Sequence, residues 1–119
     1  MKLFEVIDNG VPEHQQLLHC FDNAWRAIMA MDKAGEADGA KLIHAMVTNA
    51  EGRSFAHGWI EKNGTALDFA RDADNPQDMN AAKYREALQA ENVFEYDALK
   101  AMILGARNGH YGPWESSLT

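Results

Sequence analysis

Apolar side chains recur at helical spacing through the first third of the chain. Pro12 suits the first turn of a helix, and Gly35 is a typical residue to end one. Between them the apolar positions are separated by three or four residues: Leu17, Phe21, Trp25 and Ile28. This periodicity predicts an amphipathic helix with one buried stripe.

The middle of the chain changes to runs of strand length separated by turn residues. The runs are 41–48, 54–62 and 65–72, and the Asn63-Gly64 pair between the last two is a strong hairpin signal. The sequence therefore predicts an antiparallel meander. A short apolar run at 3–7, ended by Asp-Asn-Gly, predicts a strand before the first helix.

The last third predicts a helix, a strand and a helix. Asn75 resembles a helix cap and Pro76 a first helical residue, leading into a helical segment at 79–91. Residues 92–96 predict a fourth strand beyond the N-terminal run, and Asp97 predicts the cap of a final helix that Gly109 ends. Helices and strands in this order indicate an α+β fold.

Composition narrows the class of protein. With 119 residues, 46% of them hydrophobic, the chain is expected to form a single domain, 1–119, with one core. The net charge of −7 and the lack of a basic cluster argue against a nucleic-acid partner. We expect neither a signal peptide nor a membrane span, because no apolar stretch approaches roughly 20 residues. The expected location is the cytoplasm.

The hairpin register places a histidine beside a carboxylate. If Lys62 faces Thr65 across the Asn63-Gly64 turn, paired positions sum to 127, and Trp59 lies opposite Asp68. His57 and Asp68 are then diagonal neighbours on one face, about 7 to 8 Å apart at the backbone. A carboxylate in that position fixes one tautomer of the imidazole and leaves its other nitrogen available. The structural alternative is a polar pair on a solvated sheet face.

Cys20 gives this pair a possible chemical role. It is the single cysteine, which excludes an intrachain disulfide and a thiolate zinc cluster. On the predicted helix it lies at the flank of the apolar stripe, beside Ala24 and Ala27, where a sheet can approach closely. A thiol next to an imidazole is a candidate nucleophile.

The order Cys20, His57, Asp68 resembles that of the papain-like and transglutaminase-like cysteine enzymes. The stretch "AHGWIEKNGTALDF" is similar to the "HAWVE…DG…D" pattern of that superfamily, and the resemblance covers about 50 of the 119 residues. It implies a fold in which a helix carrying the cysteine packs on a small antiparallel sheet, with two further helices.

The resemblance also implies roles. Cys20 would be the nucleophile, His57 the general base and acid, and Asp68 the residue that orients His57, acting on amide or isopeptide bonds through a thioester. The expected partners are peptide, protein or small amide substrates, with no cofactor and no metal. Backbone N–H groups near Cys20 are expected to stabilise the oxyanion, with Gln15 or Gln16 as weaker side-chain candidates.

Two aromatic residues complete the candidate site. We expect Trp59, two residues after His57, and Trp114, in the aromatic tail 108–115, to contact substrate. For Trp114 the structural alternative is that it fastens the tail over the core.

Two other functions stay open. The scaffold could be a binding or regulatory module without catalysis. Alternatively, if His44 shared a face with His57, then His44, His57 and Asp68 would form a metal site of three protein ligands.

Overall fold

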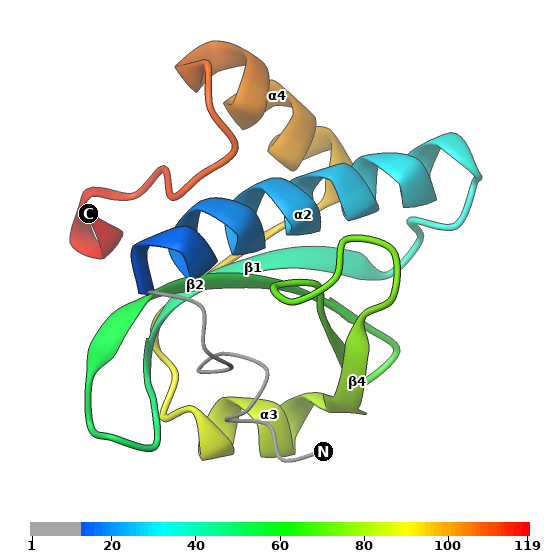
Figure 1. Cartoon of the computed structure of the whole chain (residues 1–119). Coiled ribbons are helices and arrows are strands. Elements are labelled where there is room, and N and C mark those ends of the chain that lie inside the picture. The colour runs from blue at the N-terminus through cyan, green and yellow to red at the C-terminus, as the bar shows by residue number, and fades with distance from the viewer. Residues whose placement is uncertain (1–12) are drawn as a thin grey trace.

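A computed structural model describes the backbone of residues 13–119 and the side chains from residue 19 onward (Figure 1). The strand expected at 3–7 lies outside the described residues. The elements follow in the order α2 (Glu13–Lys33), β1 (Ala40–Thr48), β2 (Ser54–Lys62), β3 (Thr65–Asp68), β4 (Gln77–Asn80), α3 (Ala81–Ala87), β5 (Glu91–Tyr96), α4 (Ala98–Asn108) and the 3-10 turn η1 (Ser116–Leu118).

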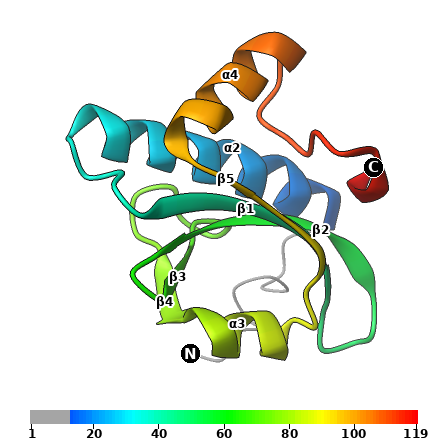
Figure 2. The same ribbon diagram turned by 180° about the vertical axis from the view of Figure 1, so that it is seen from behind.

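The strands form one antiparallel sheet in the order β4-β3-β2-β1-β5. Helices α2 and α4 cover one face and α3 covers the other, as both views show (Figures 1 and 2). Each face carries its own buried cluster. Ile43, Trp59 and Tyr84 belong to the cluster under α3, whereas Ile28 and Leu42 belong to the one under α2 and α4. The fold is therefore α+β, as predicted.

Helix α2 ends where the sequence predicts, with Gly35 at a φ of 74° after the last helical residue. Its buried stripe is rotated from the predicted one. Cys20, Phe21, Ala24 and Ile28 are buried, whereas Trp25 is half-buried. Cys20 thus lies on the buried face itself rather than on its flank. Gly58 of β2 allows this approach, since a Cβ there would lie 2.9 Å from the Phe21 ring.

The meander and its register are confirmed, although β3 ends at Asp68 rather than at residue 72. Lys62 pairs with Thr65 and Ile60 with Leu67, so paired positions sum to 127. Asn63 and Gly64 have φ values of 54° and 77°, both in the left-handed region that the two central positions of a type I′ turn require. On the other side of β2, His57 pairs with Ala45 and His44 with Gly58.

The helix start predicted at Asn75 and Pro76 is wrong. Residues 77–80 form strand β4, which pairs with β3 from Asp68↔Gln77 to Thr65↔Asn80. The helix begins at Ala81, where the Asn80 side chain accepts the Lys83 backbone N–H at 3.1 Å. The strand prevails because the outer edge of β3 has unpaired backbone groups that β4 satisfies. β5 is thus the fifth described strand.

The last strand and the last helix agree with the prediction. Asp97 caps α4 by accepting the Lys100 N–H at 2.8 Å, and Gly109 ends the helix at a φ of 71°. From Gly109 the chain returns across the α2 side of the molecule, and it ends near the first turns of α2 (Figure 1). No helix in the described range 13–119 is long and apolar enough to cross a membrane.

Candidate active site

Cys20, His57 and Asp68 meet at an edge of strand β2. β3 pairs with β2 only between Ile60 and Lys62, so β2 has no β3 partner at His57. His57 Nε2 lies 2.8 Å from Asp68 Oδ2. The Cys20 side chain interacts with His57 both electrostatically and through a hydrogen bond. The structure therefore brings the three candidate residues together from α2, β2 and β3.

The Asp68 carboxylate is held by three donors. The Ala70 backbone N–H donates to Oδ1 at 2.8 Å, while His57 and the Tyr84 hydroxyl both bond Oδ2. Burial alone would raise the pKa of this carboxyl group, but the charge of His57 and the three hydrogen bonds lower the pKa overall. Asp68 is therefore ionised although it is fully buried.

The imidazole of His57 is held in its charged form. Burial lowers its pKa, but attraction to Asp68 and then to Cys20, with hydrogen bonds to both, raises the pKa to about 10. Nε2 bonds Asp68, and Nδ1 makes no close hydrogen bond to nitrogen or oxygen among the described residues. A protonated ring can donate from both of its nitrogens.

Tyr84 of α3 is a component that the sequence did not reveal. Its hydroxyl donates to Asp68 Oδ2 and lies 3.0 Å from His57 Nε2, and its side chain is fully buried. Along the chain it looks like an ordinary apolar position of a short helix. Only the packing of α3 under the sheet makes it a neighbour of the pair.

Trp59 lies beneath His57 rather than at the surface. Its ring is stacked near the imidazole at a centroid distance of 5.7 Å, and its side chain is fully buried. The Trp59 indole donates to Glu61 Oε2 at 2.9 Å. The Arg85 guanidinium donates two hydrogen bonds to the same carboxylate, at 2.7 and 2.8 Å. Trp59 thus packs against His57 in the interior, and its expected contact with substrate stays a prediction.

The triad is closed to solvent. The exposed fractions are 0% for Cys20, 0% for His57 and 1% for Asp68. Cys20 also lies seven residues after Glu13, the first residue of α2, so its own backbone N–H is inside the helix rather than among the first four unbonded ones. The expected oxyanion donor near Cys20 is therefore not provided by its own amide. Gln15 and Gln16 belong to α2, but their side chains lie outside the described ones.

Trp114 fastens the C-terminal tail. Its ring packs against His44 at 4.9 Å and against Tyr96 at 5.1 Å, and its indole donates to the His110 carbonyl. Tyr111 stacks on Trp25 at 4.1 Å. These contacts match the structural alternative considered for the tail, and the tail passes over α2 toward the triad.

His44 lies on the other face of the sheet from His57. His44 pairs with Gly58, the residue after His57. Because successive residues of a strand point to opposite faces, the side chains of His44 and His57 lie on opposite faces of the sheet. Burial lowers the pKa of His44 to about 3, aided by His57 and His110, so its ring is neutral. No group of three His, Cys, Asp or Glu residues in the described part of the chain converges on a metal position. The three-ligand metal site is therefore not formed.

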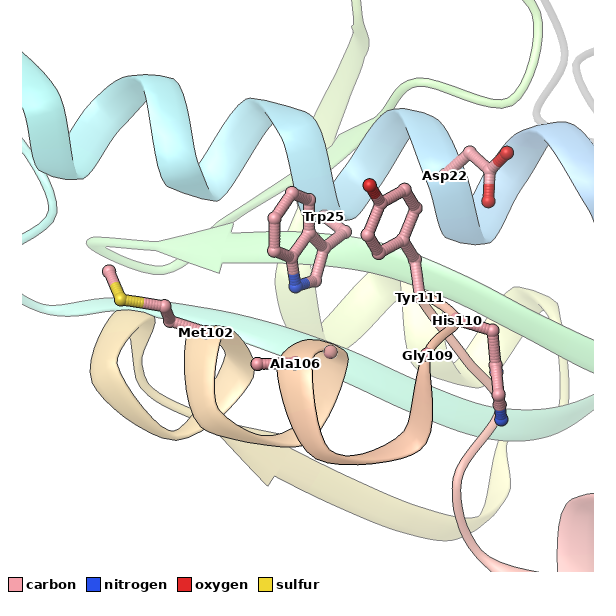
Figure 3. A pocket seen from close by; sticks show the side chains of 8 residues that line it. Asp22, Trp25, Met102, Ala106, Gly109, His110 and Tyr111 are labelled. Carbon is pink, nitrogen blue, oxygen red and sulfur yellow. The ribbon is translucent and has the colours of Figure 1, made fainter.

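A separate pocket of about 650 Å³ lies between α2, α4 and the tail (Figure 3). Trp25 and Tyr111 form its aromatic wall, with Asp22 on α2, Met102 on α4 and His110 on the tail around it. The described residues that line it include no member of the triad. The pocket is thus not the place where a substrate would meet Cys20.

No protein-family model, curated protein or solved structure matches the chain. Function is therefore inferred from the residues and their geometry.

Proposed function

We propose that the protein is a small cysteine enzyme with a papain-like or transglutaminase-like core that acts on amide or isopeptide bonds. The observation that supports the proposal is the convergence of Cys20, His57 and Asp68. The His57–Asp68 bond is 2.8 Å long, and the thiol interacts with the same imidazole. Nucleophilic cysteines need such a neighbour, because the thiolate is the attacking species.

The proposed reaction has two steps. The Cys20 thiolate attacks the substrate carbonyl, and the C–N bond breaks as His57 gives its proton to the departing amine, leaving a thioester on Cys20. Water or a second amine then attacks the thioester and gives its proton to His57, and the sulfur leaves as thiolate. Asp68 keeps the imidazole in one orientation through both steps. No oxidant, metal or cofactor is consumed.

Alkylation of Cys20 by iodoacetamide tests the first requirement of this mechanism. Because the chain holds a single cysteine, the mass increase reports on that thiol alone. We expect Cys20 to be alkylated at pH 7 at a rate that depends on His57. His57→Asn should slow this reaction, since it removes the positive charge beside the sulfur. His19→Asn, at the exposed neighbour of Cys20, is the matched control and should leave the rate unchanged.

An alkylation rate at pH 7 that does not change in His57→Asn would exclude the enzyme. If the thiol is activated, peptide and glutamine amides provide the next test. Ammonia release without a second amine indicates hydrolysis, and incorporation of a labelled primary amine indicates transfer. Cys20→Ser should abolish both.

The second candidate is a binding or regulatory module on the same scaffold. Complete burial of Cys20 favours it, because a nucleophile must meet its substrate. On this alternative Cys20 resists alkylation in the folded protein at every pH and reacts only after denaturation.

A further inference from the structure

The C-terminal tail ends beside the proposed nucleophile. Leu118, the last residue of η1, is only 6% exposed and belongs to one buried cluster with Cys20, Phe21 and Ala56. The half-buried side chains of Met46, Ala70 and Phe94 pack around this cluster. A leucine from the far end of the described chain thus occupies an apolar recess at the thiol.

The tail reaches this recess as a strap without regular structure. No helix or strand holds residues 109–115 in place. Side-chain contacts hold them: Tyr111 stacks on Trp25 at 4.1 Å, Trp114 packs on Tyr96 at 5.1 Å, and the Tyr96 hydroxyl donates to Glu115 at 3.3 Å. Such a strap can leave the body of the domain without disturbing the sheet, because none of its residues pairs with a strand.

We propose that the recess holding Leu118 is the substrate subsite for an aliphatic, leucine-like side chain next to the scissile carbonyl, and that residues 109–119 cover it until substrate displaces them. The inference rests on the proposed function and names its substrate class. Two observations carry it. The recess lies in the cluster that contains the nucleophile. The side chain that fills it is the aliphatic side chain of Leu118, which is surrounded by apolar groups. A charged or amide side chain would be left there without a polar partner.

The cover also accounts for the burial of Cys20. A thiol that is 0% exposed cannot meet a carbonyl, so a segment must move before the reaction. Leu118 is the member of the cluster that is neither on α2 nor on the sheet. Its departure opens the recess while Cys20, His57 and Asp68 stay on their own elements.

Iodoacetamide alkylation of Leu118→Ala tests the cover. We expect the rate at Cys20 to rise about tenfold or more over the wild-type protein, a factor that corresponds to about 1.4 kcal/mol of lost local stability. Ser117→Ala, at an exposed position in the same turn, should not change the rate. Val47→Ala removes buried methyl groups in the cluster under α3 and controls for a general loss of stability. Equal rates for Leu118→Ala and Val47→Ala would overturn the cover.

The His57→Asn background separates this inference from the proposed function. Covering is steric, so Leu118→Ala should accelerate alkylation there as well, measured above pH 9 where the thiol ionises without help. Acceleration in that background, with no effect of His57→Asn on the alkylation rate at pH 7, would keep the cover and reject the enzyme. An activated thiol whose reaction ignores Leu118→Ala would keep the enzyme and reject the cover.

The substrate class has its own readout. In Leu118→Ala, N-acetyl-leucinamide at millimolar concentration should slow alkylation of Cys20 by filling the vacated recess, whereas N-acetylglycinamide should not. Equal protection by the two amides, or none by either, would overturn the assignment of an aliphatic subsite.

Discussion

The Nε2 atom of His57 lies 2.8 Å from Oδ2 of Asp68, and neither side chain is exposed beyond 1%. The pair joins β2 to the end of β3, where the two strands no longer pair with each other. Burial opposes both charges, yet the attraction between them and the donors from Ala70 and Tyr84 keep both groups charged. The same bond that orients His57 toward Cys20 is therefore part of what holds this end of the sheet together.

Replacing Asp68 by Asn should strongly destabilise the protein. The imidazolium would lose its counter-charge in a buried site, which costs about 3 to 5 kcal/mol. Chemical denaturation at pH 7 measures the loss, and an NMR titration of His57 should find its pKa lowered. Asp78→Asn, on the exposed side of neighbouring β4, is the control and should leave both quantities unchanged. Equal stability of the two variants would contradict the charged pair.

Tyr84→Phe should weaken the hydrogen bonding of Asp68 while leaving the His57–Asp68 pair in place. The substitution removes one of the three donors to Asp68, and losing a buried hydrogen bond costs about 1 to 3 kcal/mol. Because Ala70 and His57 still hold the carboxylate, alkylation of Cys20 should still respond to His57→Asn, while chemical denaturation at pH 7 measures the loss of stability. Tyr111→Phe is the matched control, since Tyr111 packs through its ring. A larger loss of stability in Tyr111→Phe would contradict the role assigned to Tyr84.

The sequence predicts the pairing of His57 with Asp68 better than it predicts the surroundings of that pair. Asn63 and Gly64 determine a two-residue turn, and that turn alone places His57 and Asp68 on one face. The turn predicted from these two residues is present in the folded structure. Tyr84 has no local signal, because its role depends on where α3 packs.

The error at Asn75 and Pro76 has a similar cause. Both residues satisfy the local rules for a helix start, but β3 offers an open edge that residues 77–80 complete. The contact between the end of the tail and Cys20 also has no local signal in the sequence. Nothing in the neighbourhood of Leu118 along the chain indicates that it packs in the same cluster as Cys20.

Acid should destabilise the protein through His44. The pKa of this buried residue is about 3 in the folded state and about 6.5 in an unfolded chain. Between these values the unfolded state binds the extra proton, so stability is lost as pH falls from 6.5 toward 3, with a slope of up to about 1.4 kcal/mol per pH unit. Denaturant titrations at pH 6.5 and 4.5 measure the slope. His44→Leu should flatten it, and an unchanged slope in that variant would contradict the assignment.

Alkali should destabilise the protein through His57. Its pKa is raised to about 10 in the folded state, so the stability it contributes is complete below pH 6.5 and is lost as pH rises toward 10. Combined with His44, this places the maximum of stability near pH 6.5. His57→Asn should flatten the alkaline side, while the exposed control His19→Asn should leave that side unchanged. A stability maximum near pH 9 would contradict the prediction.

Gly105→Ala should destabilise the protein, although alanine has a higher helix propensity than glycine. Alanine normally stabilises a helix by about 1 kcal/mol relative to glycine, but a Cβ at Gly105 would lie 2.8 Å from Trp25 Nε1. Trp25 is held there by its bond to the Ala101 carbonyl at 2.9 Å and by Tyr111 stacked on its face. Overpacking of this kind costs about 1 to 3 kcal/mol, so we expect a net loss of stability in chemical denaturation. In a Trp25→Leu background the clash is absent, and the same substitution should become stabilising.

Because Tyr111 lies in the strap that ends at Leu118, Gly105→Ala should also accelerate alkylation of Cys20. An unchanged rate would mean that the two ends of the strap are independent.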